Sequence, residues 1–288
     1  SVSLAPDHAL RCTVGCRNQR FQPSSESVGG LRRQRSSYEN MCGTGHCRRQ
    51  LPDCQILGVP LKTMPSSRSL SIILPLHNEA DSIHLLIDAL HESMRAWKGK
   101  WEIICVDDGS KDNTWSSVQK LATTHARIQG LRFTRNFGKE AAILAGLEAA
   151  QGAWVVVMDG DGQHPPALLP DLLRHAENDA FEIIAGKKRV RAPENAAAGM
   201  LSRVFNQIMH AATGLDLQNS CDYRLLKRPV IEALLRMPER IRFFRAMTVW
   251  TGFAQLDVEF DVLPRLAGNS AWSTRGLISL AVNGITGF

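Results

Sequence analysis

The sequence has no apolar run that approaches the roughly 18 residues needed to cross a bilayer. Its N-terminal segment also lacks the apolar core of a secretion signal. We therefore expect no transmembrane helix within this chain. Contact with a membrane would be made at its surface or through an anchor outside the chain.

Two nucleotide-binding motifs are absent as well. No G-x-G-x-x-G follows the first predicted strand, and no G-x-x-x-x-G-K-S/T occurs anywhere in the chain. These absences argue against dinucleotide-dependent oxidoreductases and P-loop NTPases.

Cysteine is scarce beyond residue 65, where only Cys105 and Cys221 occur. A disulfide framework in this larger part of the chain is therefore not expected. The other five cysteines lie within residues 1–65. Their spacing, with His46 beside Cys47, matches the two ligand pairs of a zinc site only loosely.

Positive charge is concentrated in the same N-terminal segment. Residues 1–65 hold nine basic and four acidic side chains, which leaves +1 of the net charge of +6 for residues 66–288. We predict that residues 1–65 form a disordered basic leader, or precede a start at Met41 or Met64, and that residues 66–288 form the folded domain. The nearly neutral charge of that domain argues against a nucleic-acid partner.

From Leu70 onward, short apolar runs alternate with segments of helical periodicity. Strands are predicted, in chain order, at residues 71–74, where Pro75 would end the strand, and at residues 101–106, 128–133, 154–158 and 181–185. Helices are predicted between them, around residues 83–90 and 118–121 and at residues 140–150 and 168–176. Strands separated by helices of this length indicate an α/β fold, in which helices cover both faces of a mostly parallel sheet.

The second half of the chain is less periodic. It is predicted to contain a helix at residues 195–214, a short strand or turn at residues 222–226, and a helix begun by Pro229. An amphipathic segment at residues 277–288 is expected either to pack on the sheet or to lie in a membrane interface.

Polar and charged residues follow the ends of the first four predicted strands. In an open parallel sheet, ligands bind beyond the carboxyl ends of the strands. We therefore expect these residues to meet at one edge and to form the functional site. They are Asn78 and Glu79, then Asp107 and Asp108, then Arg135, Asn136 and Lys139, and finally Asp159, Asp161 and Gln163.

Asp159 and Asp161 directly follow the fourth predicted strand. Residues two apart in an extended segment point the same way, so both carboxylates can face one cation, and Gln163 can add a third oxygen. Mg²⁺ and Mn²⁺ favour such oxygen ligands and bind phosphates at the same time. The alternative for an isolated Asp-Gly-Asp is a solvated turn, but its position at a strand end favours a metal site.

Asp107 and Asp108 have two interpretations. Asp-Gly is an ordinary turn former, so one of the pair needs no further role. In the functional interpretation, Asp107 contacts the base or ribose of a nucleotide, and Asp108 supports the metal region. Lys139 and Arg135 would then meet phosphate, unless they are simply solvated.

Four motifs together resemble glycosyltransferase family 2, and within it the branch of dolichyl-phosphate mannosyltransferases and bacterial polyprenyl-phosphate glycosyltransferases. The resemblance covers residues 69–288. The motifs are Leu74-Pro-Leu-His-Asn-Glu79, Val106-Asp-Asp-Gly-Ser110 with Asp112, Arg135-Asn-Phe-Gly-Lys139 and Asp159-Gly-Asp-Gly-Gln-His-Pro-Pro166. The family commonly has Ala and Leu where this chain has Gly160 and Gly162, a departure that keeps the expected metal ligands.

The resemblance implies that residues 66–288 form a GT-A catalytic domain that uses a nucleotide-sugar donor in a single inverting displacement. The residues implied to hold the nucleotide are Pro75, Asn78, Glu79 and Asp107, and Asp159 is implied to contact the diphosphate. Asp108 and Lys139, from the argument above, complete the predicted nucleotide-sugar site. Those implied to bind Mg²⁺ or Mn²⁺ are Asp159, Asp161 and Gln163, and Asp161 is also a catalytic candidate. In later segments, the resemblance implies Asp222 as the base, Arg224 as a phosphate contact and Arg265 as the contact to the lipid phosphate.

The implied acceptor is a polyprenyl phosphate at the cytoplasmic face of a membrane. A phosphate monoester has a second pKa near ~6, so it is largely dianionic at neutral pH and already nucleophilic. A strong base is then unnecessary, and we expect Asp222 to act mainly by orientation. Two alternatives remain. One is a polysaccharide acceptor, although the chain lacks the Glu-Asp and Gln-x-x-Arg-Trp motifs of processive family members, and the other is a non-catalytic nucleotide-sugar-binding protein.

Overall fold

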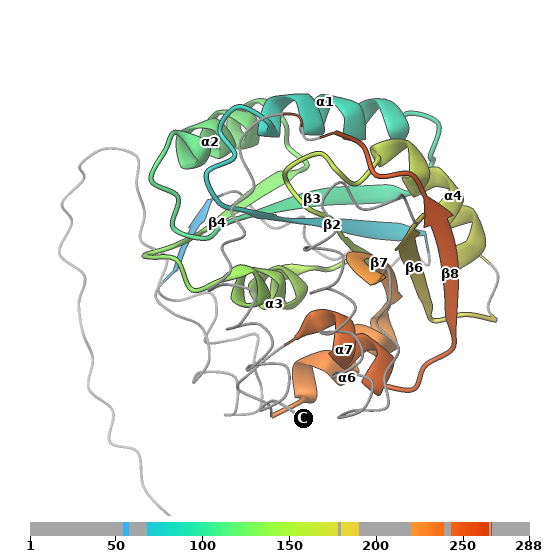
Figure 1. Ribbon diagram of the computed structural model, residues 1–288. Helices are drawn as coiled ribbons and strands as arrows, with labels where there is room; N and C mark the ends of the chain where they lie inside the picture. Colours follow the sequence, from blue (N-terminus) through green and yellow to red (C-terminus); the bar gives the residue numbers. More distant parts are fainter. Residues whose placement is uncertain are drawn as a thin grey trace, which may run out of the picture. The chain divides into compact units, whose positions relative to one another are not determined.

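An eight-stranded sheet forms the centre of the described structure (Figure 1). This computed structural model describes residues 54–57, 68–177, 180–189, 220–238, 243–264 and 266. All of them belong to one structural unit, residues 50–288. The strand order across the sheet is β1-β4-β3-β2-β5-β7-β6-β8.

The elements have the following bounds. The strands are β1 Cys54–Leu57, β2 Ser69–Leu76, β3 Lys100–Asp107, β4 Ile128–Phe133, β5 Trp154–Val157, β6 Ile183–Lys188, β7 Ser220–Lys227 and β8 Gln255–Phe260. The helices are α1 Ile83–Ser93, α2 Thr114–Thr124, α3 Lys139–Ala149, α4 Leu169–Ala176, α6 Arg228–Arg236 and α7 Phe244–Trp250, and the short 3₁₀ helix η2 spans Pro166–Leu168.

The middle of the sheet is parallel. Strands β4, β3, β2 and β5 all run the same way, and β1 and β7 flank them in the antiparallel sense. At the far edge, β6 is antiparallel to β7 and parallel to β8. The predicted α/β fold with a mostly parallel sheet is therefore confirmed. The chain moves from β2 through β3 to β4 and then returns to place β5 on the other side of β2, which is the strand-order reversal where such sheets bind ligands.

Helices cover both faces of the sheet. Helices α1, α2 and α4 lie on one side, and α3, α6 and α7 lie on the other (Figure 1). Along β2, Leu70, Ile72 and Leu74 belong to the first core, whereas Ile73 belongs to the second. Since successive side chains point to opposite faces, a strand covered on both sides is largely apolar. This explains the apolar run at residues 72–76 of β2.

Most predicted elements occur within about two residues of their expected ends, the usual uncertainty of such boundaries. One difference is that β2 does not end before Pro75. The fixed φ of proline is compatible with a strand, and pairing continues because the Asp108 N–H donates to the Leu76 carbonyl (2.9 Å). The segment at residues 222–226 is a strand rather than a turn. Strand β1 lies within residues 1–65 and pairs with β4, so four residues of the predicted leader contribute to the sheet.

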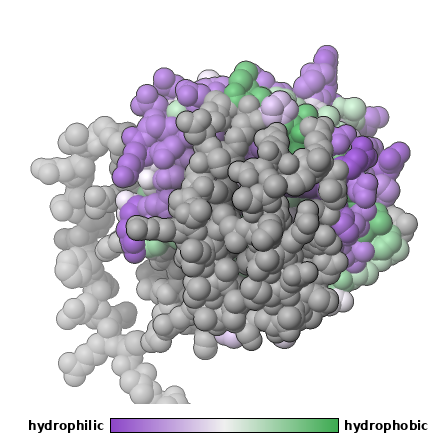
Figure 2. Space-filling model, in the orientation of Figure 1, coloured by the Kyte–Doolittle hydropathy of each residue, from purple (hydrophilic) through white to green (hydrophobic). Residues whose placement is uncertain are grey.

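Two predicted helices, at residues 195–214 and 277–288, lie outside the described residues. Among the residues that are described, no helix is long and apolar enough to cross a membrane. The described surface visible in Figure 2 is mainly hydrophilic, with hydrophobic residues in small separate groups. The large apolar side chains that are exposed among the described residues are Leu85, Trp250, Leu263 and Leu266.

Candidate active site

The loops that follow β2 and β3 are joined by hydrogen bonds. The Asn78 N–H donates to Ser110 Oγ (2.9 Å), and Asn78 Oδ1 accepts from the Lys111 N–H (2.9 Å). Asn78 has a φ of 56°, a left-handed conformation that Asn adopts more readily than most residues. The Glu79 N–H donates to Thr114 Oγ1 (2.8 Å). Asn78 and Glu79, both predicted to bind the nucleotide, thus lie at the expected edge of the sheet.

Asp107 ends β3 with a fully buried carboxylate. Its Oδ1 accepts from the Ser110 N–H (3.0 Å), and its Oδ2 lies 3.3 Å from Arg132 Nε in an ion pair. This pair lacks hydrogen-bond geometry, so Oδ2 has no hydrogen-bond donor among the described residues. Pro75, another predicted nucleotide contact, lies beside Asp107 because it pairs with Val106 in the sheet.

Asp108 braces the loop between β4 and α3. Its carboxylate accepts from the backbone N–H groups of Phe137 (2.7 Å) and Gly138 (2.9 Å). Gly138 has a φ of 99°, which a residue with a Cβ rarely adopts. Burial raises the pKa of Asp108, although the two hydrogen bonds oppose this effect. The side chain therefore determines where α3 begins and where Lys139, its first residue, lies.

Asp108→Ala is expected to lower the free energy of unfolding by about 1–3 kcal/mol, because two partly buried N–H groups lose their acceptor. Asp108→Asn keeps one acceptor oxygen and should lose less. Urea unfolding of the wild type and both variants would measure the difference. An unchanged transition for Asp108→Ala would contradict the bracing role.

A chain of four charged groups crosses the carboxyl end of the sheet. Lys139 Nζ lies 2.5 Å from Asp159 Oδ1 and 2.5 Å from Asp222 Oδ2. Arg245 binds the same Asp222 carboxylate through Nε (2.7 Å to Oδ1) and Nη2 (3.2 Å to Oδ2). The Asp222 side chain is 3% exposed, whereas the other three are between 26% and 32% exposed. These contacts join the loop after β5 to α3, β7 and α7.

The two cations determine the charge state of Asp222. Burial alone raises the pKa of this carboxyl, but the charges and hydrogen bonds of Arg245 and Lys139 outweigh burial and hold the pKa well below its usual range. Lys139 likewise outweighs burial at Asp159 and lowers its pKa. Asp222 is therefore ionised at neutral pH and is a weak base.

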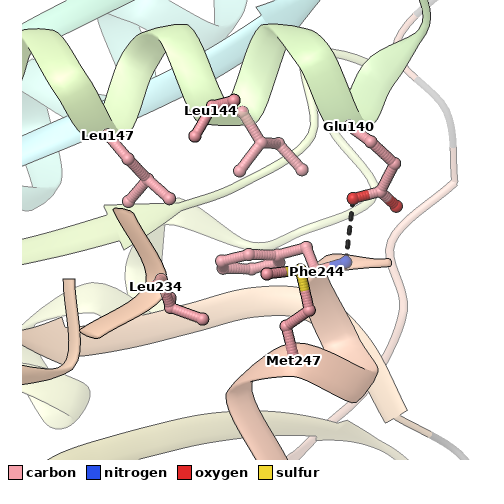
Figure 3. Close-up of a pocket in the computed structure, with 7 residues that line it drawn as sticks. Glu140, Leu144, Leu147, Leu234, Phe244 and Met247 are labelled. Carbon is pink, nitrogen blue, oxygen red and sulfur yellow. Dashed lines mark hydrogen bonds between the residues drawn. The ribbon is translucent and has the colours of Figure 1, made fainter. Parts of the chain in front are cut away.

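A small apolar hollow lies between α3, α6 and α7 (Figure 3). Its lining residues are Glu140, Ile143, Leu144, Leu147, Leu234, Phe244 and Met247. Glu140 Oε2 accepts from the Phe244 N–H (2.8 Å). Burial, followed by the charge of Asp222, raises the pKa of Glu140. Two adjacent residues of α3, Lys139 and Glu140, thus hold the start of α7, one through Asp222 and the other directly.

The loop after β5 is held by its own backbone and by the segment after β8. Asp161 Oδ1 accepts from the Gln163 N–H (3.0 Å). The Leu266 N–H donates to the Asp161 carbonyl (3.1 Å), and the Leu263 N–H donates to the Gln163 carbonyl (3.2 Å). Gly162 has a φ of 77°, and a Cβ there would lie 2.4 Å from the Leu266 side chain. This packing requires glycine at residue 162, where the family commonly has Leu.

His164 orients Asp159, a role that the sequence pattern did not predict. His164 Nδ1 accepts from the Asp159 N–H (3.0 Å), so the neutral ring carries its proton on Nε2, which lies 3.9 Å from Asp159 Oδ2. Burial lowers the pKa of His164 and favours this neutral form. The ring is stacked on Tyr223, with 5.1 Å between the ring centroids.

The Arg224 side chain is buried in the protein interior. Only 1% of the residue is exposed. Its guanidinium donates to the Cys221 carbonyl, Thr248 Oγ1, Gln255 Oε1 and Ser220 Oγ. An acceptor phosphate would reach Arg224 only if these bonds broke, so its geometry argues against the predicted phosphate contact. Arg265, the other predicted contact, lies outside the described residues.

Arg245 is a functional candidate that the sequence pattern did not reveal. It lies in α7, a helix that was not predicted either. The one signal in the sequence is a single arginine within an otherwise apolar run, residues 243–247. Its partner Asp222 lies 23 residues earlier, so no local spacing rule connects the two.

Comparisons with known proteins identify relatives of this chain. Residues 71–235 match Glycosyl transferase family 2. The putative glycosyltransferase CsbB of Bacillus subtilis (strain 168) is 36% identical over 220 residues, which cover 76% of this chain and 66% of that protein. The prophage bactoprenol glucosyl transferase homolog of Escherichia coli (strain K12) is 31% identical over 220 residues, which cover 76% of this chain and 72% of that protein. The match thus spans about two thirds of the length of these relatives.

Solved structures resemble this chain in fold. Glucosyl-3-phosphoglycerate synthase from Mycobacterium tuberculosis, in complex with Mn²⁺ and UDP-glucose, has a TM-score of 0.51 and 20% identity, and the match covers 75% of this chain and 76% of that chain. Mannosyltransferase PcManGT from Pyrobaculum calidifontis, in complex with GDP-Man and Mn²⁺, has a TM-score of 0.50 and 22% identity, with 78% and 64% covered. These matches agree with the expected GT-A fold. The family match and the relatives above 30% identity establish that this chain belongs to glycosyltransferase family 2.

Proposed function

We propose that this chain transfers a hexose from a nucleotide-diphosphate sugar to a polyprenyl phosphate, with inversion, at a membrane surface. Relatives named bactoprenol glucosyl transferase support this choice of acceptor. The observation that carries the proposal is the chain of contacts from Asp159 through Lys139 to Asp222. It joins the loop after β5, which is predicted to bind the donor and is called the donor loop below, to Asp222, the predicted base. A transfer reaction needs both substrates held together.

Asp159, Asp161 and Gln163 would hold Mg²⁺ or Mn²⁺. Their oxygens are the hard ligands that these ions favour, and Asp159 already faces a cation, the ammonium of Lys139. In the described part of the chain, no three His, Cys, Asp or Glu side chains form a metal site. This is consistent with a site completed by an amide and by phosphates of the donor. The ion would supply positive charge to offset the charge of the departing diphosphate.

An oxygen of the acceptor phosphate would be the nucleophile. It would attack the anomeric carbon of the sugar and form a new C–O bond. The bond from that carbon to the donor diphosphate would break, and the diphosphate would leave with the electron pair. A dianionic phosphate has no proton to lose, so the low pKa of Asp222 is no obstacle. Asp222 would orient Lys139 and Arg245 rather than act as a strong base.

Residues 66–288 would be the catalytic domain, working at the cytoplasmic face of a membrane and without a nucleic-acid partner. The lipid acceptors named for relatives support contact with a membrane. Strand β1 would be the contribution of residues 1–65 to that domain.

The test offers the purified full chain a panel of nucleotide sugars and a short polyprenyl phosphate, with Mn²⁺, Mg²⁺ or a chelator. We expect one donor to yield a glycosylated lipid phosphate only when a metal is present. The polyprenol of the same length, which lacks phosphate, should yield no product. Calorimetric binding of a donor without transfer to any polyprenyl phosphate would indicate a non-catalytic binding protein, and transfer to a polysaccharide alone would indicate the other acceptor class.

A further inference from the structure

Arg245 has hydrogen-bond donors that no described residue uses. A guanidinium carries five N–H groups in one plane. Nε and Nη2 each donate to Asp222, and Nη1 donates to the Ser220 carbonyl (3.3 Å). One N–H on each terminal nitrogen is therefore left without an acceptor in the described part of the chain. The Arg245 side chain is 28% exposed, so it is not sealed off from solvent.

Lys139 likewise has N–H groups without an acceptor among the described residues. Its ammonium carries three N–H groups, of which one donates to Asp222 Oδ2, whereas the contact with Asp159 Oδ1 is an ion pair without hydrogen-bond geometry. Lys139 Nζ and Arg245 Nη2 both contact Asp222 Oδ2, at 2.5 Å and 3.2 Å. The two nitrogens can be no farther apart than the sum of these distances. Two cations with spare donors thus lie beside one buried carboxylate.

We propose that Lys139 and Arg245 form a cradle for one phosphate group, with Asp222 as the brace between them. The planar fork of arginine suits a phosphate, and charge-assisted hydrogen bonds to its oxygens are the strong kind. The assignment of this phosphate to the lipid acceptor rests on the proposed function. Two contacts favour the acceptor. Lys139 contacts Asp159 of the predicted donor loop, whereas Arg245 reaches Asp222 from α7 rather than from that loop.

Asp159 controls the charge of this cradle. Lys139, Arg245 and Asp222 together carry one positive charge, and the contact with Asp159 neutralises it. A cation that binds Asp159 would restore the positive charge, so phosphate is expected to bind more tightly when Mn²⁺ is present. Asp159→Asn removes the same negative charge without any metal, and it should therefore strengthen phosphate binding in a metal-free solution.

Calorimetry of the full chain with inorganic phosphate and with a short polyprenyl phosphate tests the cradle. Arg245→Gln is expected to weaken the binding of both ligands at least about tenfold, and Arg245→Lys less, because it keeps the charge but not the fork. The control Arg236→Gln, at an arginine side chain that is 81% exposed on α6, should bind as the wild type does. Unchanged phosphate binding by Arg245→Gln, or weaker binding by Asp159→Asn, would overturn the cradle.

Binding of nucleoside diphosphates in the presence of Mn²⁺ tests whether the cradle holds a phosphate of the donor instead. We expect UDP and GDP to bind Arg245→Gln within about twofold of the wild type, since a change in the acceptor subsite leaves the donor's own hydrogen bonds in place. Equal losses of affinity for the diphosphate and the lipid phosphate would overturn the assignment to the acceptor.

If Arg245→Gln fails to fold, Asp222→Asn/Arg245→Gln removes the buried pair together and should fold without regaining phosphate affinity. A wild type that binds lipid phosphate through Arg245 but transfers no sugar would contradict the proposed function alone.

Discussion

Asp161→Asn is expected to lower the rate of metal-dependent sugar transfer on the order of 10³-fold while the protein stays folded. The change removes one of two carboxylate charges from the predicted metal site. It keeps the shape of the side chain, and the amide oxygen can still accept from the Gln163 N–H, which holds the loop. The measurement is the initial rate at saturating Mg²⁺ and at saturating Mn²⁺, with circular dichroism to check the fold.

Asp222→Asn is the matched comparison, because it is the same chemical change at the residue proposed to lie beside the acceptor. It should leave measurable turnover, since a dianionic acceptor phosphate needs no strong base. A much larger loss of transfer rate for Asp161→Asn than for Asp222→Asn would therefore indicate that Asp161 supplies charge to the metal site, whereas Asp222 acts mainly by orientation. Equal activity of the wild type and Asp161→Asn at saturating metal would rule out the metal assignment.

Lys139→Met is expected to lower the free energy of unfolding by about 2–4 kcal/mol near neutral pH. Lys139 is the cation between Asp159 and Asp222, so its removal leaves two carboxylates facing each other across the site. The expected loss lies below that of a fully buried pair, because 32% of the lysine side chain is exposed. Urea unfolding measures the loss, and Lys120→Met, at an exposed lysine of α2, is the control.

The free energy of unfolding that Lys139→Met loses should depend on pH. Lys139 and Arg245 hold the folded-state pKa of Asp222 below its unfolded value of about 4, so this carboxylate contributes stability above that value and loses it as the pH falls through the folded pKa. Without Lys139 the folded pKa is depressed less. The difference between the wild type and Lys139→Met should therefore be largest near neutral pH and narrow below about pH 4. A difference that stays constant across this range would contradict the electrostatic explanation.

The site residues that directly follow a strand could be predicted from the sequence. Apolar runs predicted β2, β3, β4 and β5, and the carboxyl ends of parallel strands meet at one edge of a sheet. This reasoning placed Asn78, Asp107, Asp108 and Asp159 together, because each is fixed by the strand or loop that precedes it. Helical periodicity predicted α3 from residue 140, one residue after its observed start at Lys139.

The partners of the later residues could not be predicted in the same way. Arg224 and Asp222 lie two residues apart in β7, yet the first is buried among protein acceptors and the second faces the site. Their surroundings depend on α7, which packs against β7 and which the sequence pattern did not reveal. The sequence consequently suggested Arg224 for phosphate, whereas we propose Arg245.

The sequence by itself determined the parallel sheet, the edge where the site lies and the kinds of side chain that meet there, because strand periodicity and strand ends are local properties. The pairing of charges was decided by the tertiary structure. Lys139 and Asp222 are 83 residues apart, and their contact exists because the fold brings the first residue of α3 next to β7. The charge that each residue carries, and the ligand that it can still bind, depend on such neighbours, which no local pattern specifies.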